Sequence, residues 1–437
     1  MSPVPGDTLP CPLAPDDAAS GLNRALRRWL GALLRELQPA LAATARACQA
    51  DRYRKHFDHF AHAVFLCYHG LAGSGSLRVS YATFPTAAGL VALAGLTTPH
   101  PERLGISFSQ LADSSHSRPA ALLSGLLPTL VARVRAAGVR PGLAIPAELR
   151  VLDSTFLRLA LGVAPWLPST GGKDHPGVRA QVLYAPAFDL VERLVVTDTR
   201  SNDVQGFDAL LLDDPARLAA LAGGTLVVDL GYYSHARFAR LRTAGVHFVS
   251  RLHAQAALRI EADCPLQIPL PGLDGGRITI QSDQRITLGS PTNRAGAVLP
   301  GLRLVTALVA ATPRAQRAGA QPTVYRLITD RWDLSAAEVA QLYLWRWEIE
   351  LCFRWLKHRV KLPIWLGYSR NAVELTVALA MVVHLLLVLA ARAVGLTRRT
   401  PALLARLRAN LSQVPAPTVL AAMQLPLPLW PPAPAPT

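Results

Sequence analysis

The chain has 437 residues, long enough to bury a large core and to divide into two or three domains. It is basic, with 45 Lys plus Arg against 29 Asp plus Glu, a formal net charge of +16. Residues 354–408 hold ten basic residues and one acidic residue, whereas residues 151–300 hold 14 of each. A local basic excess indicates a polyanionic partner, of which nucleic acid is the commonest. Because 41 of the 45 cations are Arg, a coding bias toward arginine is the alternative explanation.

The cysteines and the N-terminus argue against a secreted protein and against a zinc site. The five cysteines are Cys11, Cys48, Cys67, Cys264 and Cys352, and they form no CxxC pair and no zinc-type spacing with histidine. An odd, scattered set is typical of reduced thiols in the cytoplasm. The first thirty residues lack a basic start followed by an apolar run, so no secretory signal is expected.

Residues 20–140 are expected to be helical, because apolar residues recur at helical spacing in LRRWLGALLRELQPALAATA and RPAALLSGLLPTLVARVRAAG. Within this region, residues 105–127 look like a short helix, a polar turn and a longer helix. A DNA-binding helix-turn-helix has this layout, and so do many other helix pairs. We therefore take residues 1–145 as a helical N-terminal region in which DNA binding is the expected role.

From Leu149 the pattern changes to short apolar runs separated by turns. In chain order we expect strands at 149–159, 179–186 and 191–199, a helix at 207–224, a strand at 225–231, a helix at 234–245 and a strand at 246–252. Three consecutive strands followed by alternating helices and strands predict an α/β fold with a mixed sheet.

Residues 253–325 are expected to form a β-rich insertion, because five more strand-like runs occur there. The runs are 258–262, 277–282, 285–289, 302–310 and 323–329. The core would then have a first part at 146–252 and a second part at 326–410, which includes the C-terminal helices. Residues 411–437 form a Pro-rich tail.

One stretch has the composition of a membrane span. Seventeen uncharged residues, LTVALAMVVHLLLVLAA, lie between Glu374 and Arg392, with His384 near their middle. Their length is at the short edge of what crosses a bilayer. A buried helix at the centre of a large domain also explains them, and we favour it because the sequence has no second such segment. No membrane association is expected.

Two aspartates lie at the ends of apolar runs. Asp153 follows LRVL and precedes Ser154, and Asp229 follows TLVV. A carboxylate at the end of a buried strand costs desolvation free energy unless a metal ion or another cation compensates it. Ligand sites in α/β sheets also form at strand ends. Each aspartate alone has the ordinary turn aspartate as its alternative explanation.

A third carboxylate lies in LYLWRWEIELCFRWLK, residues 342–357. On a helix with about 100° per residue, six polar side chains fall within a sector about 80° wide, opposite an apolar stripe. They are Tyr343, Arg346, Glu350, Arg354, Lys357 and Lys361, and the stripe is Leu342, Trp345, Ile349, Cys352 and Leu356. A solvated face with i,i+4 ion pairs is one explanation. A single acid among four bases also suits a metal ligand beside cations that bind phosphate.

The spacing of four of these residues resembles a family signature. Tyr343, two residues, Arg346, three residues, Glu350, six residues and Lys357 match the Y-R-E-K pattern of the DDE transposases of the insertion-sequence-four family. The flanking RW.IE..F..LK positions agree as well, and the resemblance covers roughly residues 100–395. One departure is Leu230, where relatives commonly carry Arg.

The resemblance implies an RNase H-like core with Asp153, Asp229 and Glu350 as catalytic and metal-binding residues. Two Mg²⁺ ions, or Mn²⁺ in their place, would be the cofactors. Tyr343, Arg346 and Lys357 would bind DNA, and we extend this role on physical grounds to Arg354 and Lys361 on the same helix face. The 121 residues that separate Asp229 from Glu350 would hold the β-rich insertion.

The implied function is a DNA transposase that binds the terminal inverted repeats of its element and cuts and joins DNA in cut-and-paste movement. Its partners would be these repeats and a target DNA, and it would act as a homodimer in the cytoplasm, associated with the nucleoid. A catalytically inactive, transposase-derived DNA-binding protein is the alternative. A metal-independent carboxylate hydrolase is a third reading, which leaves the cations unexplained. Lys173 and His175 are either DNA contacts or polar loop residues.

Overall fold

The structure is a computed structural model. It describes residues 15–51, 57–100, 102–159, 164–167, 176–198, 203–266, 277–290, 298–362, 364–396 and 400–415. Lys173, His175 and the Pro-rich tail beyond residue 415 lie outside the described residues.

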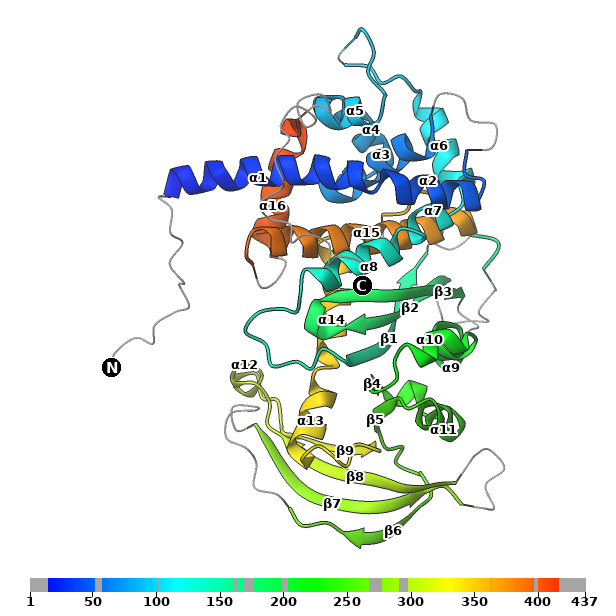
Figure 1. Ribbon diagram of the computed structural model, residues 1–437, viewed down its shortest axis with the longest axis vertical. Helices are drawn as coiled ribbons and strands as arrows, with labels where there is room; N and C mark the ends of the chain where they lie inside the picture. The colour runs from blue at the N-terminus through cyan, green and yellow to red at the C-terminus, as the bar shows by residue number, and fades with distance from the viewer. Residues whose placement is uncertain are drawn as a thin grey trace, which may run out of the picture.

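The N-terminal helices gather toward one end of the molecule (Figure 1). They are α1 (Pro15–Glu36), α2 (Gln38–Ala47), α3 (His59–Ala72), α4 (Leu77–Thr83), α5 (Ala88–Leu93), α6 (Phe108–Ser117), α7 (Ala121–Ser124) and α8 (Leu127–Ala136), joined by α16 (Pro401–Asn410) from the C-terminal part. Polar N-caps begin several of them: the side chains of Asp58, Ser76 and Ser107 each accept a backbone N–H of the first turn. The helical character expected for residues 20–140 is confirmed.

The helix pair expected at 105–127 differs from the sequence interpretation. Its first helix, α6, is present and begins with a capping box formed by Ser107 and Gln110. The longer second helix is interrupted, because α7 ends at Ser124 and α8 begins only at Leu127. Leu122 and Leu123 are fully buried, and α7 packs against α15. The segment therefore forms part of a packed helical core and does not present a long exposed helix.

In the described part of the chain, nine strands form one sheet beside these helices. Its strands are β1 (Leu149–Arg158), β2 (Gly177–Ala185), β3 (Leu190–Asp198), β4 (Thr225–Val228), β5 (His247–Arg251), β6 (Leu258–Asp263), β7 (Ile278–Leu288), β8 (Leu299–Val309) and β9 (Thr323–Thr329). The order is β3-β2-β1-β4-β5-β9-β8-β7-β6. Among the described strands, β1 with β4 and β4 with β5 pair in parallel, and the other neighbouring strands pair antiparallel. The predicted α/β class with a mixed sheet is confirmed.

Two sequence expectations fail locally. The runs 277–282 and 285–289 belong to one strand, β7. Bulges at Ile280/Ser282 and Ile286/Leu288 shift its pairing and break the alternation of side chains, so the sequence looks like two separate runs. The helix expected at 207–224 is α9 (Asp203–Phe207), a π-helical turn at Asp208–Leu212, and α10 (Pro215–Ala219). The side chain of Asp214 caps α10, so a new helix begins there.

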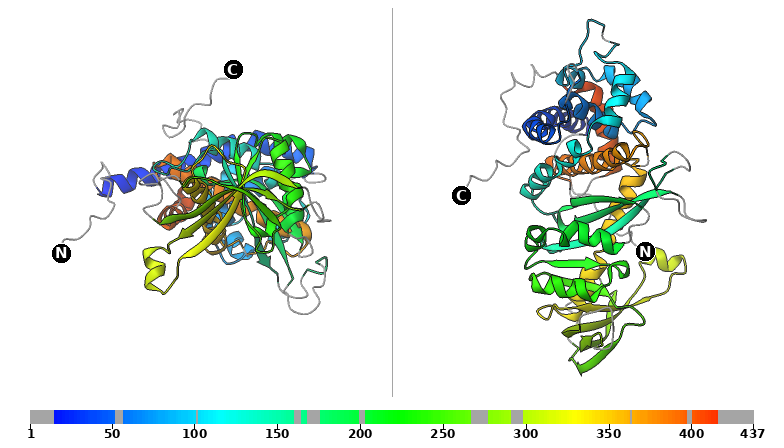
Figure 2. Two further views of the ribbon diagram at one scale, coloured as in Figure 1. Left: turned by 90° about the horizontal axis from the view of Figure 1, so that it is seen from below. Right: turned by 90° about the vertical axis from the view of Figure 1, so that its right-hand side faces the viewer.

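Helices cover both faces of the sheet (Figures 1 and 2). On one face lie α9, α10 and α11 (His235–Thr243), and on the other lie α8, α13 (Ala336–Leu344), α14 (Trp347–His358) and α15 (Arg370–Ala393). A short helix, α12 (Pro313–Arg317), follows β8. Alternate strand residues supply two separate apolar cores: Val151 and Val227 pack on the α13–α15 side, and Leu152 and Val228 on the α9–α11 side.

Helix α15 lies between the N-terminal helices and the sheet, as the right-hand view of Figure 2 shows. Among the described residues it is the one helix long and apolar enough to cross a membrane, and 94% of its most apolar stretch is buried inside the protein. His384 at its middle is fully buried. This agrees with the favoured interpretation of the stretch as a core helix.

The strands of residues 253–325 continue the sheet of the core. Strand β9 pairs with β5 on one side and with β8 on the other, so β6–β8 extend the sheet outward from it. The expected boundary at residue 325 falls inside β9. The division of the chain into domains therefore stays a prediction.

Candidate active site

The pairing of β1 with β4 brings Asp153 and Asp229 together. Leu152 pairs with Val228 in this parallel register, and each aspartate is the next residue in its strand or just beyond it. Because side chains alternate along a strand, both aspartates point to the same face as Val151 and Val227. This is the face that α13 and α14 cover.

Glu350, on α14, also lies beside these two aspartates. The backbone that carries it differs from the single helix expected. The single helix expected across residues 342–357 is wrong: α13 ends at Leu344 and α14 begins at Trp347. The backbone N–H groups of Glu348 and Ile349 bond to the carbonyls of Trp345 and Arg346, three residues back, at 3.0 and 3.2 Å. This tighter turn separates two helices that share one amphipathic pattern.

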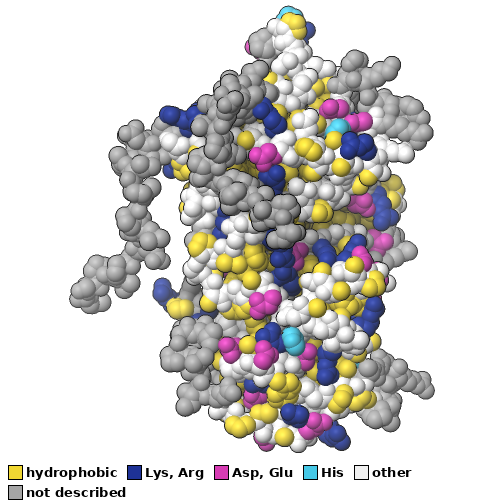
Figure 3. Space-filling model, in the orientation of Figure 1, with side chains coloured by type: hydrophobic (Ala, Val, Ile, Leu, Met, Phe, Trp, Pro, Cys, Tyr) yellow, Lys and Arg dark blue, Asp and Glu magenta, His cyan; other side chains and the backbone are white. Residues whose placement is uncertain are grey.

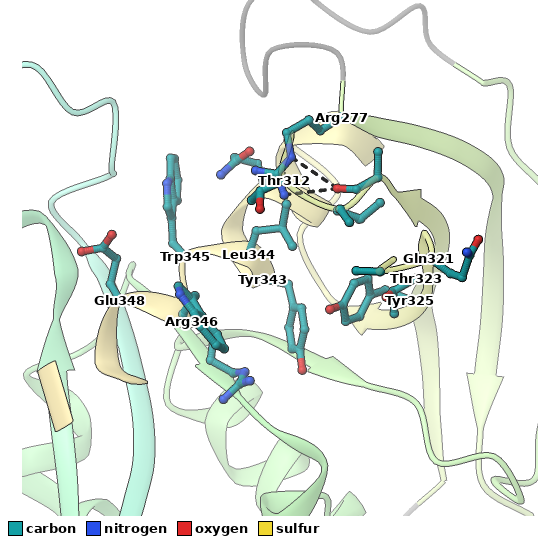
Figure 4. Close-up of a pocket in the computed structure, with 16 residues that line it drawn as sticks. Arg277, Thr312, Gln321, Thr323, Tyr325, Tyr343, Leu344, Trp345, Arg346 and Glu348 are labelled. Atoms are coloured by element: carbon teal, nitrogen blue, oxygen red, sulfur yellow. Dashed lines mark hydrogen bonds between the residues drawn. The ribbon is translucent and has the colours of Figure 1, made fainter. Parts of the chain in front are cut away.

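One arginine and one tyrosine bind the three carboxylates. The Arg346 guanidinium donates from Nη1 to Asp153 Oδ2 at 3.1 Å and from Nη2 to Glu350 Oε1 at 2.6 Å. The Tyr343 hydroxyl donates to Asp229 Oδ1 at 3.0 Å. Figure 4 shows the Tyr343 and Arg346 side chains extending in the same direction, away from Arg277 and Thr312. The structure thus brings together all three predicted carboxylates with two of the predicted cationic or phenolic residues.

Burial and mutual repulsion perturb the protonation of this cluster. Burial raises the pKa of Asp153 to about 6, and the nearby Asp229 and Glu350 carboxylates add to the rise, while Ser154 N–H and Arg346 oppose it. Burial also raises the pKa of Tyr343, to which the Asp229 carboxylate contributes. For Arg346 burial lowers the pKa, but Asp229, Tyr343 and the other two carboxylates outweigh it and hold the pKa above its ordinary value.

The donor set fits divalent metal ions. Among the described residues that bond to the cluster, three carboxylates face one guanidinium, which leaves two negative charges to be compensated when all are ionised. Their ligand atoms are hard oxygens, which Mg²⁺ and Mn²⁺ prefer. The side chains are neither fully buried nor fully exposed, with 19% of Asp153 and 28% of Glu350 accessible. Asp153, Asp229 and Glu350 are the residues that would hold the metal.

A different trio is closer together and lies in the core. Among the described residues, Asp189, Cys352 and His384 have potential ligand atoms that all lie within 4.8 Å of one another, and all three are buried. His384 Nε2 donates to the Asp189 backbone carbonyl at 3.0 Å, and Tyr184 donates to Asp189 Oδ1 at 2.5 Å. Burial lowers the pKa of His384 to about 3. These contacts describe a neutral core histidine that joins α15 to the β2–β3 turn.

The other expected DNA-binding residues lie at different places on α14 and beyond it. Arg354 is exposed, with its guanidinium carbon 5.7 Å from the centre of the Trp347 ring. Lys357 is partly buried, and burial lowers its pKa.

The placement of Lys361 on the same helix face is wrong. Helix α14 ends at His358, before this residue is reached. Lys361 has a φ of +61°, and its side chain donates to the Gly73 carbonyl at 2.8 Å.

No sequence pattern indicated the pocket that lies beside the carboxylates. It has a volume of about 460 Å³ and lies between the turn joining α13 to α14 and one end of β7, β8 and β9. Arg277, Tyr325, Trp345 and Trp347 line it together with Arg346 (Figure 4). These residues come from segments far apart in the chain, so only the folded sheet brings them together.

The basic excess of residues 354–408 is only partly available to a polyanion. Lys361 and Arg408 donate to backbone carbonyls, Arg408 to that of Leu71 at 2.8 Å, and Arg370 pairs with Glu374 at 3.0 Å. Figure 3 shows Lys and Arg side chains scattered over one face of the molecule, with Asp and Glu among them. The charge count alone therefore does not locate a binding surface.

Comparison with known proteins adds to this geometry. A 29% identical relative, named as a transposase, y4zB, from Sinorhizobium fredii (strain NBRC 101917 / NGR234), aligns over 298 residues, 68% of this chain and 75% of its own. A Geobacillus stearothermophilus protein named as a transposase for insertion sequence element IS5377 is 25% identical over 280 residues, 64% of this chain and 66% of its own.

A cryo-EM structure of the piggyBac transposase synaptic complex with hairpin DNA has a TM-score of 0.40 and 9% identity, covering 86% of this chain and 77% of that chain. This likeness is too slight to bear on the fold.

The family model described as "Transposase DDE domain" matches residues 145–386, more than half of the chain. The match spans β1, β4 and α14, and so includes Asp153, Asp229 and Glu350. The chain therefore belongs to the family of transposases with a DDE domain.

Proposed function

We propose that this transposase cleaves DNA strands at the terminal inverted repeats of an insertion sequence and joins them to a target, in cut-and-paste movement. One observation carries the proposal: three carboxylates from β1, the end of β4 and α14 converge, and among the described residues one guanidinium bonds to them. The proposal includes membership of the insertion-sequence-four group, on the Y-R-E-K spacing of Tyr343, Arg346, Glu350 and Lys357.

An RNase H-like core is part of the proposal. Strands β1, β2 and β3 are consecutive and antiparallel, and β4 and β5 extend the sheet in parallel from β1, with α9–α11 between them in the chain. This arrangement supports the core that the family resemblance implies. The action as a homodimer, and the location in the cytoplasm with the nucleoid, also belong to the proposal.

The proposed chemistry divides among the residues of the cluster. Asp153, Asp229 and Glu350 would hold two Mg²⁺ or Mn²⁺ ions, which when bound activate the attacking hydroxyl and stabilise the departing 3′-oxygen. Arg346 and Lys357 would contact the DNA backbone near the cut, since a guanidinium binds phosphate with two donors. Tyr343 fixes the Asp229 carboxylate through its hydroxyl. Arg354, exposed beside Trp347, would contact phosphate farther along α14.

The test is a strand-cleavage assay with the full chain and duplex DNA that carries both ends flanking this reading frame. We expect nicks at the repeat ends in Mg²⁺ and Mn²⁺, none in EDTA, and joined products when a target plasmid is added. Glu350→Gln should lose cleavage and keep end binding. Glu374→Gln, which removes a carboxylate paired with the exposed Arg370, is the matched control and should cleave normally.

The same assay separates the alternatives. End binding without cleavage by the wild-type protein would favour a transposase-derived DNA-binding protein. Equal turnover in EDTA would indicate a metal-independent hydrolase.

A further inference from the structure

The Arg346 guanidinium lies between two carboxylates proposed to hold metal. We infer that in the DNA-free protein Arg346 serves as an internal cation that occupies the site, and that it transfers to a DNA phosphate when DNA binds. Metal binding would then depend on DNA binding. This regulation rests on the proposed function and acts on the same site.

The contacts support this assignment first. One guanidinium uses Nη1 on Asp153 and Nη2 on Glu350, at 3.1 and 2.6 Å, so it joins side chains from β1 and α14 that no covalent neighbour links. A cation shared by these two carboxylates would need the position that the guanidinium holds. The guanidinium therefore competes with any ion that these two side chains would bind together.

The second support is that Arg346 is incompletely used as a donor. Its Nε is buried and has no hydrogen-bond partner among the described residues. An acceptor that reached this donor would be favoured, because an unmade hydrogen bond of a buried group costs free energy. Arg346 thus has donor capacity left for an acceptor that arrives later, and phosphate oxygens suit a guanidinium geometrically.

The third support is that Arg346 has space into which to move. It lines the pocket of about 460 Å³ between the α13–α14 turn and the strands. It also belongs to the turn between two helices, so a change in its side chain disturbs no helix interior. A side-chain rotation toward a DNA backbone in front of α14 would release Asp153 and Glu350 without rearranging the sheet.

A measurable coupling between metal and DNA follows. If Arg346 competes with metal, removing its charge raises metal affinity in the absence of DNA. If phosphate takes Arg346 away, DNA raises the metal affinity of the wild-type protein more than that of the variant. Coupling between two ligands is reciprocal and typically amounts to about 5- to 150-fold in affinity.

Mn²⁺ binding to the full chain, followed by electron paramagnetic resonance of free Mn²⁺, tests this without any measurement of activity. Without DNA, we expect Arg346→Gln to bind Mn²⁺ about tenfold more tightly than the wild-type protein. Arg370→Gln removes the same charge from an exposed arginine of helix α15, outside the metal and DNA contacts proposed above, and should leave the affinity unchanged. With uncleaved end DNA, the gap between wild type and Arg346→Gln should close. Equal or weaker Mn²⁺ binding by Arg346→Gln without DNA would overturn the inference.

Thermal unfolding of both proteins shows whether a change in Mn²⁺ binding comes from loss of the fold. Arg346→Gln leaves three carboxylates without their cation, so we expect a lower Tm than wild type in EDTA and a larger rise on adding Mn²⁺. A rise no larger than that of wild type would count against the inference. Wild-type protein that binds no Mn²⁺ with or without DNA would instead refute the proposed function. Wild-type binding with DNA, and no DNA-free gain in Arg346→Gln, would refute the inference alone.

Discussion

Two arginine–carboxylate clusters in this protein have opposite character. In the inserted strands, Arg303 binds Asp283 with two parallel hydrogen bonds, Nε to Oδ1 at 2.8 Å and Nη2 to Oδ2 at 2.6 Å. Its Nη1 donates to the carbonyls of Arg331 and Leu334, at 3.1 and 2.5 Å. Only 5% of Arg303 and 3% of Asp283 is accessible. In the candidate active site, by contrast, one guanidinium faces three carboxylates.

Charge balance, solvent accessibility and hydrogen bonding of the guanidinium distinguish a structural ion pair from a ligand-binding site. The Arg303–Asp283 pair is balanced in charge, closed to solvent and hydrogen-bonded at all three guanidinium nitrogens, and it ties β7 and β8 to the loop that begins α13. The cluster around Arg346 is unbalanced and partly accessible, and among the described residues the Arg346 Nε has no hydrogen-bond partner. The first arrangement stabilises a fold, and the second has unused capacity for ligands.

The largest expected effect is on activity. Asp153→Asn should lower the rate of DNA strand cleavage by about 10³-fold, since a lost metal ligand removes several kcal/mol of transition-state stabilisation. The free energy of unfolding should change by less than about 1 kcal/mol, because the substitution also relieves repulsion with Asp229 and Glu350. Single-turnover cleavage and urea unfolding of the same preparation measure both. A large loss of stability in Asp153→Asn would show that this cluster stabilises the fold as the Arg303 pair does, and would contradict the comparison.

For the Arg303–Asp283 pair the main expected effect is on stability. Asp283→Asn should lower the free energy of unfolding by about 3 kcal/mol, because it leaves the buried Arg303 charge uncompensated. The double variant Asp283→Leu with Arg303→Met should regain part of this loss, although the carbonyls of Arg331 and Leu334 lose their donor. Denaturant unfolding measures both variants. An Asp283→Asn protein as stable as wild type would show that the pair does not stabilise the fold.

Sequence reasoning recovered the parts of the fold and site that depend on local pattern. Strands β1–β5 follow alternation and apolar runs, and Asp153 and Asp229 stood out because a carboxylate at a strand end must be compensated. Glu350 followed from helical spacing. The parallel register that sets Asp153 beside Asp229 is consistent with the strand-end argument, but only the paired sheet fixes it.

The remaining features depend on tertiary structure. The break between α13 and α14 escaped detection because one tight turn shifts a helical pattern only slightly in phase. Tyr343 was placed on a polar helix face with an expected DNA contact, yet it is buried, and its hydroxyl donates to Asp229. Lys361 was assigned to a helix that had already ended, at a residue of positive φ. Spacing along the chain carries none of this information.

A smaller expected effect is a change of the free energy of unfolding with pH. The pKa of Asp153 lies near 6 in the folded protein against 3.8 ordinarily, so between these values the folded state binds the proton more tightly. The stability of wild type relative to Asp153→Asn should therefore fall as pH rises from about 4 to about 6, and stay level above that. Urea unfolding of both proteins across this range measures it. If the stability difference between wild type and Asp153→Asn were constant with pH, the negative charge of the cluster would be better compensated than the comparison with Arg303 implies.

The smallest expected effect comes from Tyr343→Phe. Loss of the hydroxyl removes one hydrogen bond to Asp229, worth about 1 kcal/mol, so cleavage should slow by about five- to tenfold. The ring keeps its packing near Tyr325, with centroids 5.4 Å apart, so stability should hold. Cleavage rates at saturating Mn²⁺ measure the change. A loss as large as that of Asp153→Asn would give Tyr343 a direct part in the chemistry, which the present geometry does not assign to it.

The most direct test of the central claim is a structure of the full chain with end DNA and Mn²⁺, in which anomalous scattering locates the metal. We predict Mn²⁺ at the carboxylates of Asp153, Asp229 and Glu350, with the Arg346 guanidinium moved from Asp153 and Glu350 to a DNA phosphate. A complex in which Arg346 still joins the two carboxylates, with Mn²⁺ bound elsewhere or not at all, would contradict the claim.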